Sequence, residues 1–101
     1  MTVYVDGLVG YDEAHIKPEA RQHGRRWCHL TADTEDELHA FAARLGLRPS
    51  WYQGNYARPA LRHYDLVPSK RALAVRLGAV EVDARAHLSA RVIAEMREGR
   101  A

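Results

Sequence analysis

The sequence predicts a small single α/β domain over residues 1–101, with a mixed, partly parallel sheet of about four to five strands and two to three helices. Two observations lead to this prediction. Short segments rich in β-branched and aromatic residues alternate along the chain with segments whose apolar residues recur at helical spacing. The length of 101 residues also suffices for one modest hydrophobic core and is too short for two.

The first part of the chain is predicted to form two strands separated by a long loop. Residues 2–6, TVYVD, are rich in strand-forming residues and end at Asp6. Residues 7–25 are polar and contain three glycines and one proline, which predicts a loop. A loop of that length in a small domain is usually functional or mobile. Strand character resumes at residues 26–32, RWCHLTA.

The first helix is predicted at about residues 35–45. Thr34 and Glu37 have the spacing of a capping box, which marks a helix N-terminus. Gly46 lies where a left-handed C-cap is expected. The apolar residues recur on one face, as expected of a helix packed on a core: Leu38, Phe41, Ala42 and Leu45.

The middle of the chain is predicted to be extended. Residues 50–54, SWYQG, indicate a short aromatic strand or extended segment that ends in a Gly-Asn turn. Residues 61–67, LRHYDLV, predict a further strand that is ended by Pro68.

The last third of the chain predicts two more helices and a short strand between them. Ser69 is the expected N-cap of a helix that ends at Gly78, and the apolar residues around most of its circumference predict that it is well buried. Residues 79–82, AVEV, offer a short strand. Asp83 then caps a third helix over residues 84–98.

Charge and cysteine content exclude several classes of protein. Fifteen Lys and Arg against thirteen Asp and Glu give a formal net charge of +2, which argues modestly against a basic surface for nucleic acid. Cys28 is the single cysteine, so an internal disulfide or a multi-cysteine zinc site is excluded, and a buried structural thiol is expected. No apolar run approaches the roughly 20 residues that span a bilayer. We expect a soluble, cytoplasmic protein with no membrane partner.

Acidic and histidine side chains at the predicted strand ends are the first candidates for chemistry. Side chains two residues apart on a strand share a face, so His63 and Asp65 are expected to point the same way, with Tyr64 opposite. We expect a larger set to converge, either as ligands of a divalent metal or as an acid/base group: Asp6, His29, Asp33, His63 and Asp65. As an acid/base group the catalytic residues are His63, Asp65, His29 and Asp33.

A structural alternative exists for each of these residues. Asp33 could simply flank the Thr34 cap, His29 could be a hydrogen-bonded core histidine, and Asp65 could pair with an arginine.

A second group of residues is typical of ligand binding. Ser69, Lys70 and Arg71 lie at a predicted helix N-terminus, where free amides favour a phosphate or carboxylate. The aromatic cluster of Trp51, Tyr52, Gln53 and Tyr56 could stack a nucleobase or sugar ring. Trp51, Gln53 and Tyr64 complete the set of expected ligand-binding residues. The alternatives are a serine cap with two solvated cations, and ordinary core packing of the aromatic rings.

Five segments of the chain resemble a small bacterial and phage family of domains of unknown function, DUF4031: VYVD (3–6), WCHLTADTEDELHAFAARLGL (27–47), WYQ (51–53), HYDL (63–66) and SKRALAVRLGAVEV (69–82). The resemblance implies no particular reaction. It implies that the family pattern includes Asp6, Trp27, His29, Asp33, Leu38, His39, Trp51, Gln53, His63, Tyr64, Asp65, Arg71 and Ala72. The family's second acidic residue after the first strand is Gly7 here, and residues 83–101 form a C-terminal helical extension outside the pattern.

The first function hypothesis is a protein that binds or acts on a phosphate-bearing ligand such as a nucleotide. Lys70 and Arg71 would clamp the phosphate, Trp51 would stack on the ring, and His63 and Asp65 would serve as acid/base residues or as ligands of a divalent metal cofactor. Whether the protein is an enzyme is left open.

Two alternatives belong to other classes. One is a non-catalytic accessory module that binds nucleic acid or protein through the aromatic cluster and the arginine-rich loop, which contains Arg21, Arg25 and Arg26. The other is a structural homodimer built on the last helix, whose exposed face is expected to carry Arg85, Arg91, Glu95 and Glu98.

Overall fold

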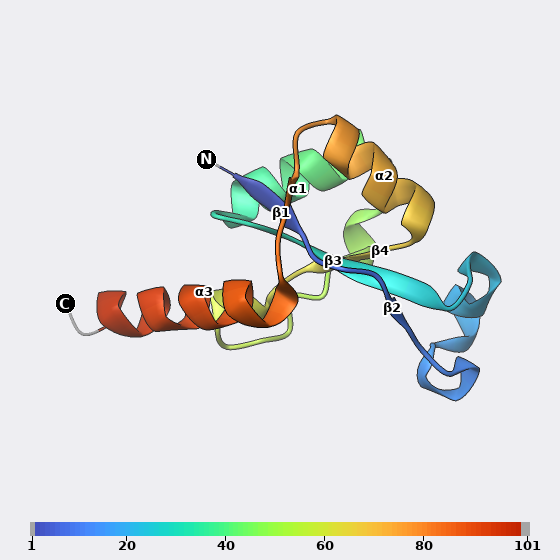
Figure 1. Ribbon diagram of the computed structural model, residues 1–101, viewed down its shortest axis with the longest axis horizontal. Coiled ribbons are helices and arrows are strands. Elements are labelled where there is room, and N and C mark those ends of the chain that lie inside the picture. The colour runs from blue at the N-terminus through green and yellow to red at the C-terminus, as the bar shows by residue number, and fades with distance from the viewer. Residues whose placement is uncertain (1, 100–101) are drawn as a thin grey trace.

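Strand β3, Arg26–Ala32, lies at the centre of a five-stranded mixed sheet in the computed structural model, which describes residues 2–99 (Figure 1). β3 pairs antiparallel with β1 (Val3–Val5), β2 (Val9–Gly10) and β4 (Tyr64–Leu66). β1 also pairs in parallel with the short β5, Val80–Glu81. The predicted α/β fold with a partly parallel sheet is therefore confirmed.

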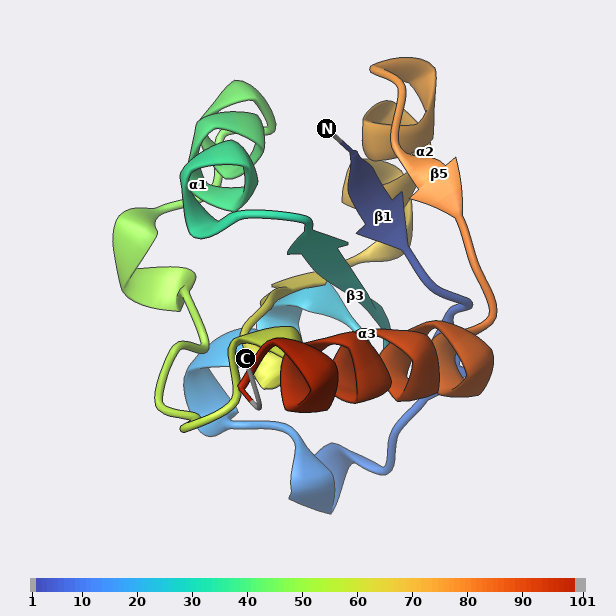
Figure 2. The same cartoon turned by 90° about the vertical axis from the view of Figure 1, so that its left-hand side faces the viewer.

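Three α-helices flank the sheet on two sides. Helices α1, Glu35–Arg44, and α2, Pro68–Arg76, lie on one side of β3, and α3, Ala84–Glu98, crosses the opposite side (Figures 1 and 2). Within the described chain, no helix is long and apolar enough to cross a membrane. Short 3₁₀ helices occupy the connections, at Glu13–His15, Pro18–His23, Pro49–Trp51 and Pro59–Leu61.

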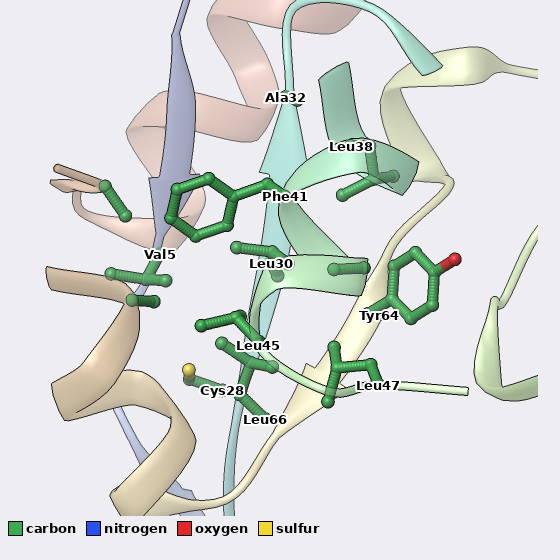
Figure 3. Packing of buried hydrophobic residues seen from close by; sticks show 13 residues of the cluster. Val5, Cys28, Leu30, Ala32, Leu38, Phe41, Leu45, Leu47, Tyr64 and Leu66 are labelled. Carbon is green, nitrogen blue, oxygen red and sulfur yellow. The ribbon is translucent and has the colours of Figure 1, made fainter. Parts of the chain in front are cut away.

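The hydrophobic core lies between the sheet and the helices α1 and α2. Every second residue of β3 points into it, because side chains alternate between the two faces of a strand: Cys28, Leu30 and Ala32. The predicted apolar stripe of α1 packs on this face and is buried, as Figure 3 shows for Leu38 and Phe41. β4 adds Tyr64 and Leu66, so the core takes side chains from segments between Val5 and Ala79 and none from α3.

Several local predictions are confirmed. β3 and α3 have the bounds predicted for the second strand and the third helix. Asp83 caps α3 by accepting a hydrogen bond from the amide of Ala86. Thr34 caps α1, since its hydroxyl accepts a 3.2 Å hydrogen bond from the amide of Glu37. Gly46 follows the C-cap of α1 with φ +77°, the left-handed conformation that favours glycine.

The start and the burial of α2 were predicted wrongly. The helix begins at Pro68 after Val67, and Ser69 makes no capping hydrogen bond. Proline suits the first helical position because its fixed φ is already helical and its missing N–H has no helical partner there. Of the helix residues only Ala74 is buried, because α2 covers the margin of the sheet with one narrow stripe.

The extended segments in the middle of the chain are shorter than predicted. Prolines start 3₁₀ turns at Pro49–Trp51 and Pro59–Leu61, so residues 50–54 form no strand. Gln53 alone pairs with His63, in an isolated antiparallel bridge, and β4 begins at the next residue. The predicted loop at residues 7–25 contains β2 and two 3₁₀ helices.

We predict that Cys28 resists alkylation in the folded protein. The thiol is buried in the core, and this burial raises its pKa to about 12, so the reactive thiolate is scarce at pH 8. Iodoacetamide should therefore label the native chain at least about a hundredfold more slowly than the urea-unfolded chain, as followed by mass spectrometry. Equal labelling rates in the two states would contradict the buried position of this thiol.

Candidate metal centre

The face of the sheet turned away from α1 and α2 carries polar side chains. On β3 these alternate with the core residues, and His29 is directly opposite Asp65 in the β3–β4 register. His63 lies two residues before Asp65 and shares its face, as predicted, while Tyr64 points into the core. One ligand atom each from His29, His63 and Asp65 lies within 4.8 Å of the others. We call these three residues the His-His-Asp cluster.

His29 is held by the carboxylate of Asp6. One carboxylate oxygen lies 2.6 Å from Nδ1 of the His29 ring, and the other accepts a 2.6 Å hydrogen bond from the His29 amide. The hydrogen bond to Asp6 raises the pKa of His29, although burial opposes this. Burial acts to raise the pKa of Asp6 in turn, but the two hydrogen bonds from His29 outweigh it and leave that pKa below its ordinary value. Nδ1 thus donates to Asp6, and Nε2 stays available.

His63 is anchored in the same way through a backbone carbonyl. Its Nδ1 lies 2.8 Å from the carbonyl oxygen of Leu61, which can only accept, so Nδ1 carries a proton. Its Nε2 lies 3.2 Å from a carboxylate oxygen of Asp65. The two groups are therefore close enough to act as ligands of one shared cation.

The His-His-Asp cluster has the chemistry of a metal site with open coordination positions. Histidines that bind metals usually donate the other ring N–H to a carboxylate or a backbone carbonyl, as His29 and His63 do here. Two imidazoles and one carboxylate suit divalent transition metals such as zinc, iron or manganese. Three protein ligands also leave room for water or a substrate oxygen.

Asp6 and Asp33 do not belong to the cluster as ligands. Asp6 is 8% exposed, and its carboxylate contacts Nδ1 of His29, on the side of the ring opposite the available Nε2 atom. Asp33 lies four residues beyond His29, or roughly 13 Å along the strand. It accepts hydrogen bonds from the amide of Thr2 at 3.0 Å and the hydroxyl of Tyr4 at 2.7 Å. The prediction that Asp33 converges with the others is therefore wrong.

The side chains of the predicted phosphate clamp at the start of α2 have partners within the protein. Lys70 donates a 2.6 Å hydrogen bond from Nζ to the carbonyl of Leu45, at the end of α1. Arg71 turns the other way, donating from Nε to the carbonyl of Asp6 at 2.8 Å and pairing with Glu81 at 3.0 Å. Ser69 is exposed and caps nothing. These partners account for two cations in a first helical turn without any bound anion.

The other predicted ligand-binding residues have structural roles. Trp51 stacks with Arg48, whose guanidinium carbon lies 5.6 Å from the ring centroid. Gln53 pairs through its backbone with His63. Tyr64 is only 2% exposed, and its hydroxyl lies 2.8 Å from Nδ1 of His39. None of the three lines the cleft that adjoins the cluster.

A cleft of about 440 Å³ lies beside the cluster, lined by residues of the polar face of the sheet and of α3. His29 and His63 line one wall, and α3 supplies Arg85, Leu88 and Arg91 to the other. These three helix residues recur every third position, so they share a face of α3. Arg85 and Arg91 were expected on an exposed face of this helix, and the structure turns both toward the sheet.

Arg91 and Glu95 attach α3 to the rest of the molecule. Arg91 donates to the carbonyls of Ala32 at 2.9 Å and Ala60 at 3.4 Å, and Glu95 accepts a hydrogen bond from the amide of Ala60. Both side chains were expected on an exposed helix face. They point inward because they bond to backbone groups at the end of β3 and in the 59–61 turn.

We predict that Lys70→Ala lowers the free energy of unfolding by about 1 kcal/mol, because it removes the hydrogen bond to the carbonyl of Leu45. Lys17→Ala, at the only other lysine and at an exposed position, is the matched control and should have little effect. Urea unfolding followed by circular dichroism measures both changes. Equal stability of the two variants would show that Lys70 does not cap α1.

The family described as Protein of unknown function (DUF4031) matches residues 15–95 of the chain. This range includes residues 84–95 of α3, which the sequence analysis placed outside the family pattern, and it begins after Asp6. Searches among curated proteins and among solved structures each find no match. Because the match spans most of the chain, including the whole His-His-Asp cluster, the protein belongs to the DUF4031 family.

Proposed function

We propose that the protein binds a divalent transition-metal ion through His29, His63 and Asp65, and that the ion holds a phosphate-bearing small molecule in the adjoining cleft. One observation carries the proposal. The three ligand atoms converge within 4.8 Å while the Nδ1 atoms of both histidines are already committed to acceptors. This arrangement leaves both Nε2 atoms and the Asp65 carboxylate for an ion.

The charges around the cleft support an anionic ligand. Asp6 is the one acidic residue among the described residues that line the cleft, and it is already paired with His29. Arg85 and Arg91 lie on the opposite wall. The hydrogen-bond partners of Arg91 are neutral carbonyls, so it adds positive charge to this wall. A phosphate can bind a metal ion and accept hydrogen bonds from an arginine at the same time.

We predict that the untagged protein binds one equivalent of Zn²⁺ and that His63→Ala weakens this binding by at least about a hundredfold. Loss of a direct ligand should cost no less than the roughly 10- to 100-fold that the loss of a supporting partner costs. Asp65→Asn, which keeps the side-chain volume, should have a similar effect. Isothermal titration calorimetry measures the affinity.

Two further variants make the metal experiment specific. His15→Ala removes an exposed histidine that lies outside the cluster and should bind Zn²⁺ like the wild type. Asp6→Asn should lose about 10- to 100-fold, because it removes only the support of His29. Unchanged Zn²⁺ affinity in both His63→Ala and Asp65→Asn would refute the metal site.

We predict that inorganic phosphate binds the protein loaded with one equivalent of Zn²⁺ and does not bind the metal-free protein. Arg85→Ala should lower this affinity about tenfold, because it removes a charged donor from the cleft. Arg97→Ala lies on the same helix outside the cleft lining and is the matched control. Phosphate binding that needs neither the metal nor Arg85 would contradict the proposal.

The same proteins distinguish the two alternative functions. Salt-sensitive binding of an oligonucleotide that survives Asp65→Asn would favour a nucleic-acid module. A dimeric mass in light scattering, without metal or phosphate binding, would favour a structural homodimer.

A further inference from the structure

We infer that the ligand of this cleft is a phosphate monoester that carries an aromatic ring, of the size of a nucleoside monophosphate, and that Tyr56 stacks on the ring. The inference rests on the proposed function, because it assigns the phosphate end of the ligand to the metal ion and Arg85. It adds the chemical class of the remainder of the ligand and the residue that recognises it.

The size of the cleft calls for more than a phosphate ion. Its volume of about 440 Å³ lies within the roughly 300–1,000 Å³ typical of small-molecule sites. A phosphate held between the metal and the arginine wall fills only a small part of this space. The rest of the cleft therefore takes the organic part of the ligand.

Part of the lining beyond the metal ligands is apolar and aromatic. Leu61 comes from the 59–61 turn, Val82 precedes the Asp83 cap of α3, and Leu88 lies in α3 itself. Leu88 is counted among the exposed large hydrophobic residues of the chain, so a ligand in the cleft would cover its side chain. Covering apolar surface of this kind favours a ligand with a hydrophobic or aromatic group.

Tyr56 is the aromatic residue placed to contact such a ring. Its own ring lies 5.9 Å from that of His63 at an angle of 36°, so it stands beside a metal ligand, and 42% of the residue is exposed. Arg62 holds it in place, since its Nε donates a 3.0 Å hydrogen bond to the carbonyl of Tyr56. Arg62 is itself paired with Glu35 at 2.9 Å, at the start of α1. A ring with a fixed backbone and a free surface is a stacking platform.

Tyr56, rather than Trp51, is the residue that we expect to stack on the ring of the ligand. Trp51 is equally exposed, but it pairs with Arg48 and does not line the cleft. Replacing Tyr56 should therefore weaken binding of the aromatic ring, and replacing Trp51 should not. Each substitution serves as the control for the other.

The test uses calorimetric titration of the Zn²⁺-loaded full chain with adenosine 5′-monophosphate, ribose 5-phosphate and adenosine. Adenosine 5′-monophosphate should bind at least about tenfold more tightly than ribose 5-phosphate, because only the former has a base to stack. Tyr56→Ala should remove this advantage and leave the affinity for ribose 5-phosphate unchanged. Tyr56→Phe should keep it, and Trp51→Ala should have no effect. Thermal melts confirm that each variant is folded.

The outcomes separate the inference from the proposed function. Metal-dependent binding of ribose 5-phosphate with no preference for adenosine 5′-monophosphate overturns the inference and leaves the proposed function standing. Loss of the preference in Trp51→Ala rather than Tyr56→Ala also overturns it. A short single-stranded oligonucleotide with a terminal phosphate that binds more tightly than the mononucleotide assigns the site to nucleic-acid ends and overturns the mononucleotide class. No metal-dependent binding of either phosphate overturns both proposals.

Discussion

The alternation of side chains along β3 is the constraint on which the rest of the structure depends. Cys28, Leu30 and Ala32 face the core, so His29 and Thr31 must face the other way. The antiparallel register with β4 then places Asp65 opposite His29. A shift of one residue in this register would bury the polar side chains and expose the core, so the packing that stabilises the fold also holds the His-His-Asp cluster together.

Asp6 connects this cluster to the helices on the far side of the sheet. Removing a carboxylate from water is costly, but Asp6 receives hydrogen bonds from the amide and the ring of His29. Its own carbonyl accepts a hydrogen bond from Arg71 of α2, and Arg71 is paired with Glu81 of β5. The orientation of His29 is therefore set by a chain of contacts that reaches from α2 and β5 to the cluster. A ring held in this way would lose little freedom on binding an ion, as the proposed metal site requires.

Local patterns in the sequence predicted the parts of the structure that depend on neighbouring residues. The bounds of β3 and α3, the cap at Thr34 and the shared face of His63 and Asp65 all follow from such patterns. The partner of Lys70 could not be predicted, because a long side chain at a helix end can reach a solvent anion or a carbonyl of another helix with similar ease. The cleft was missed for a related reason, since spacing defines a face of α3 but only tertiary packing decides what that face meets.

The two faces of the sheet contribute differently to the stability of the fold. On one side α1 buries Leu38 and Phe41, and each such side chain contributes about 1.5–3 kcal/mol of hydrophobic free energy. On the other side no described residue of α3 is buried, and the helix is attached through the hydrogen bonds of Arg91 and Glu95, each contributing about 1 kcal/mol. Tight apolar packing of α3 would have filled the space over the histidines. Attachment by a few polar contacts keeps the cleft open, so the side that contributes least to stability is the side on which a ligand can bind.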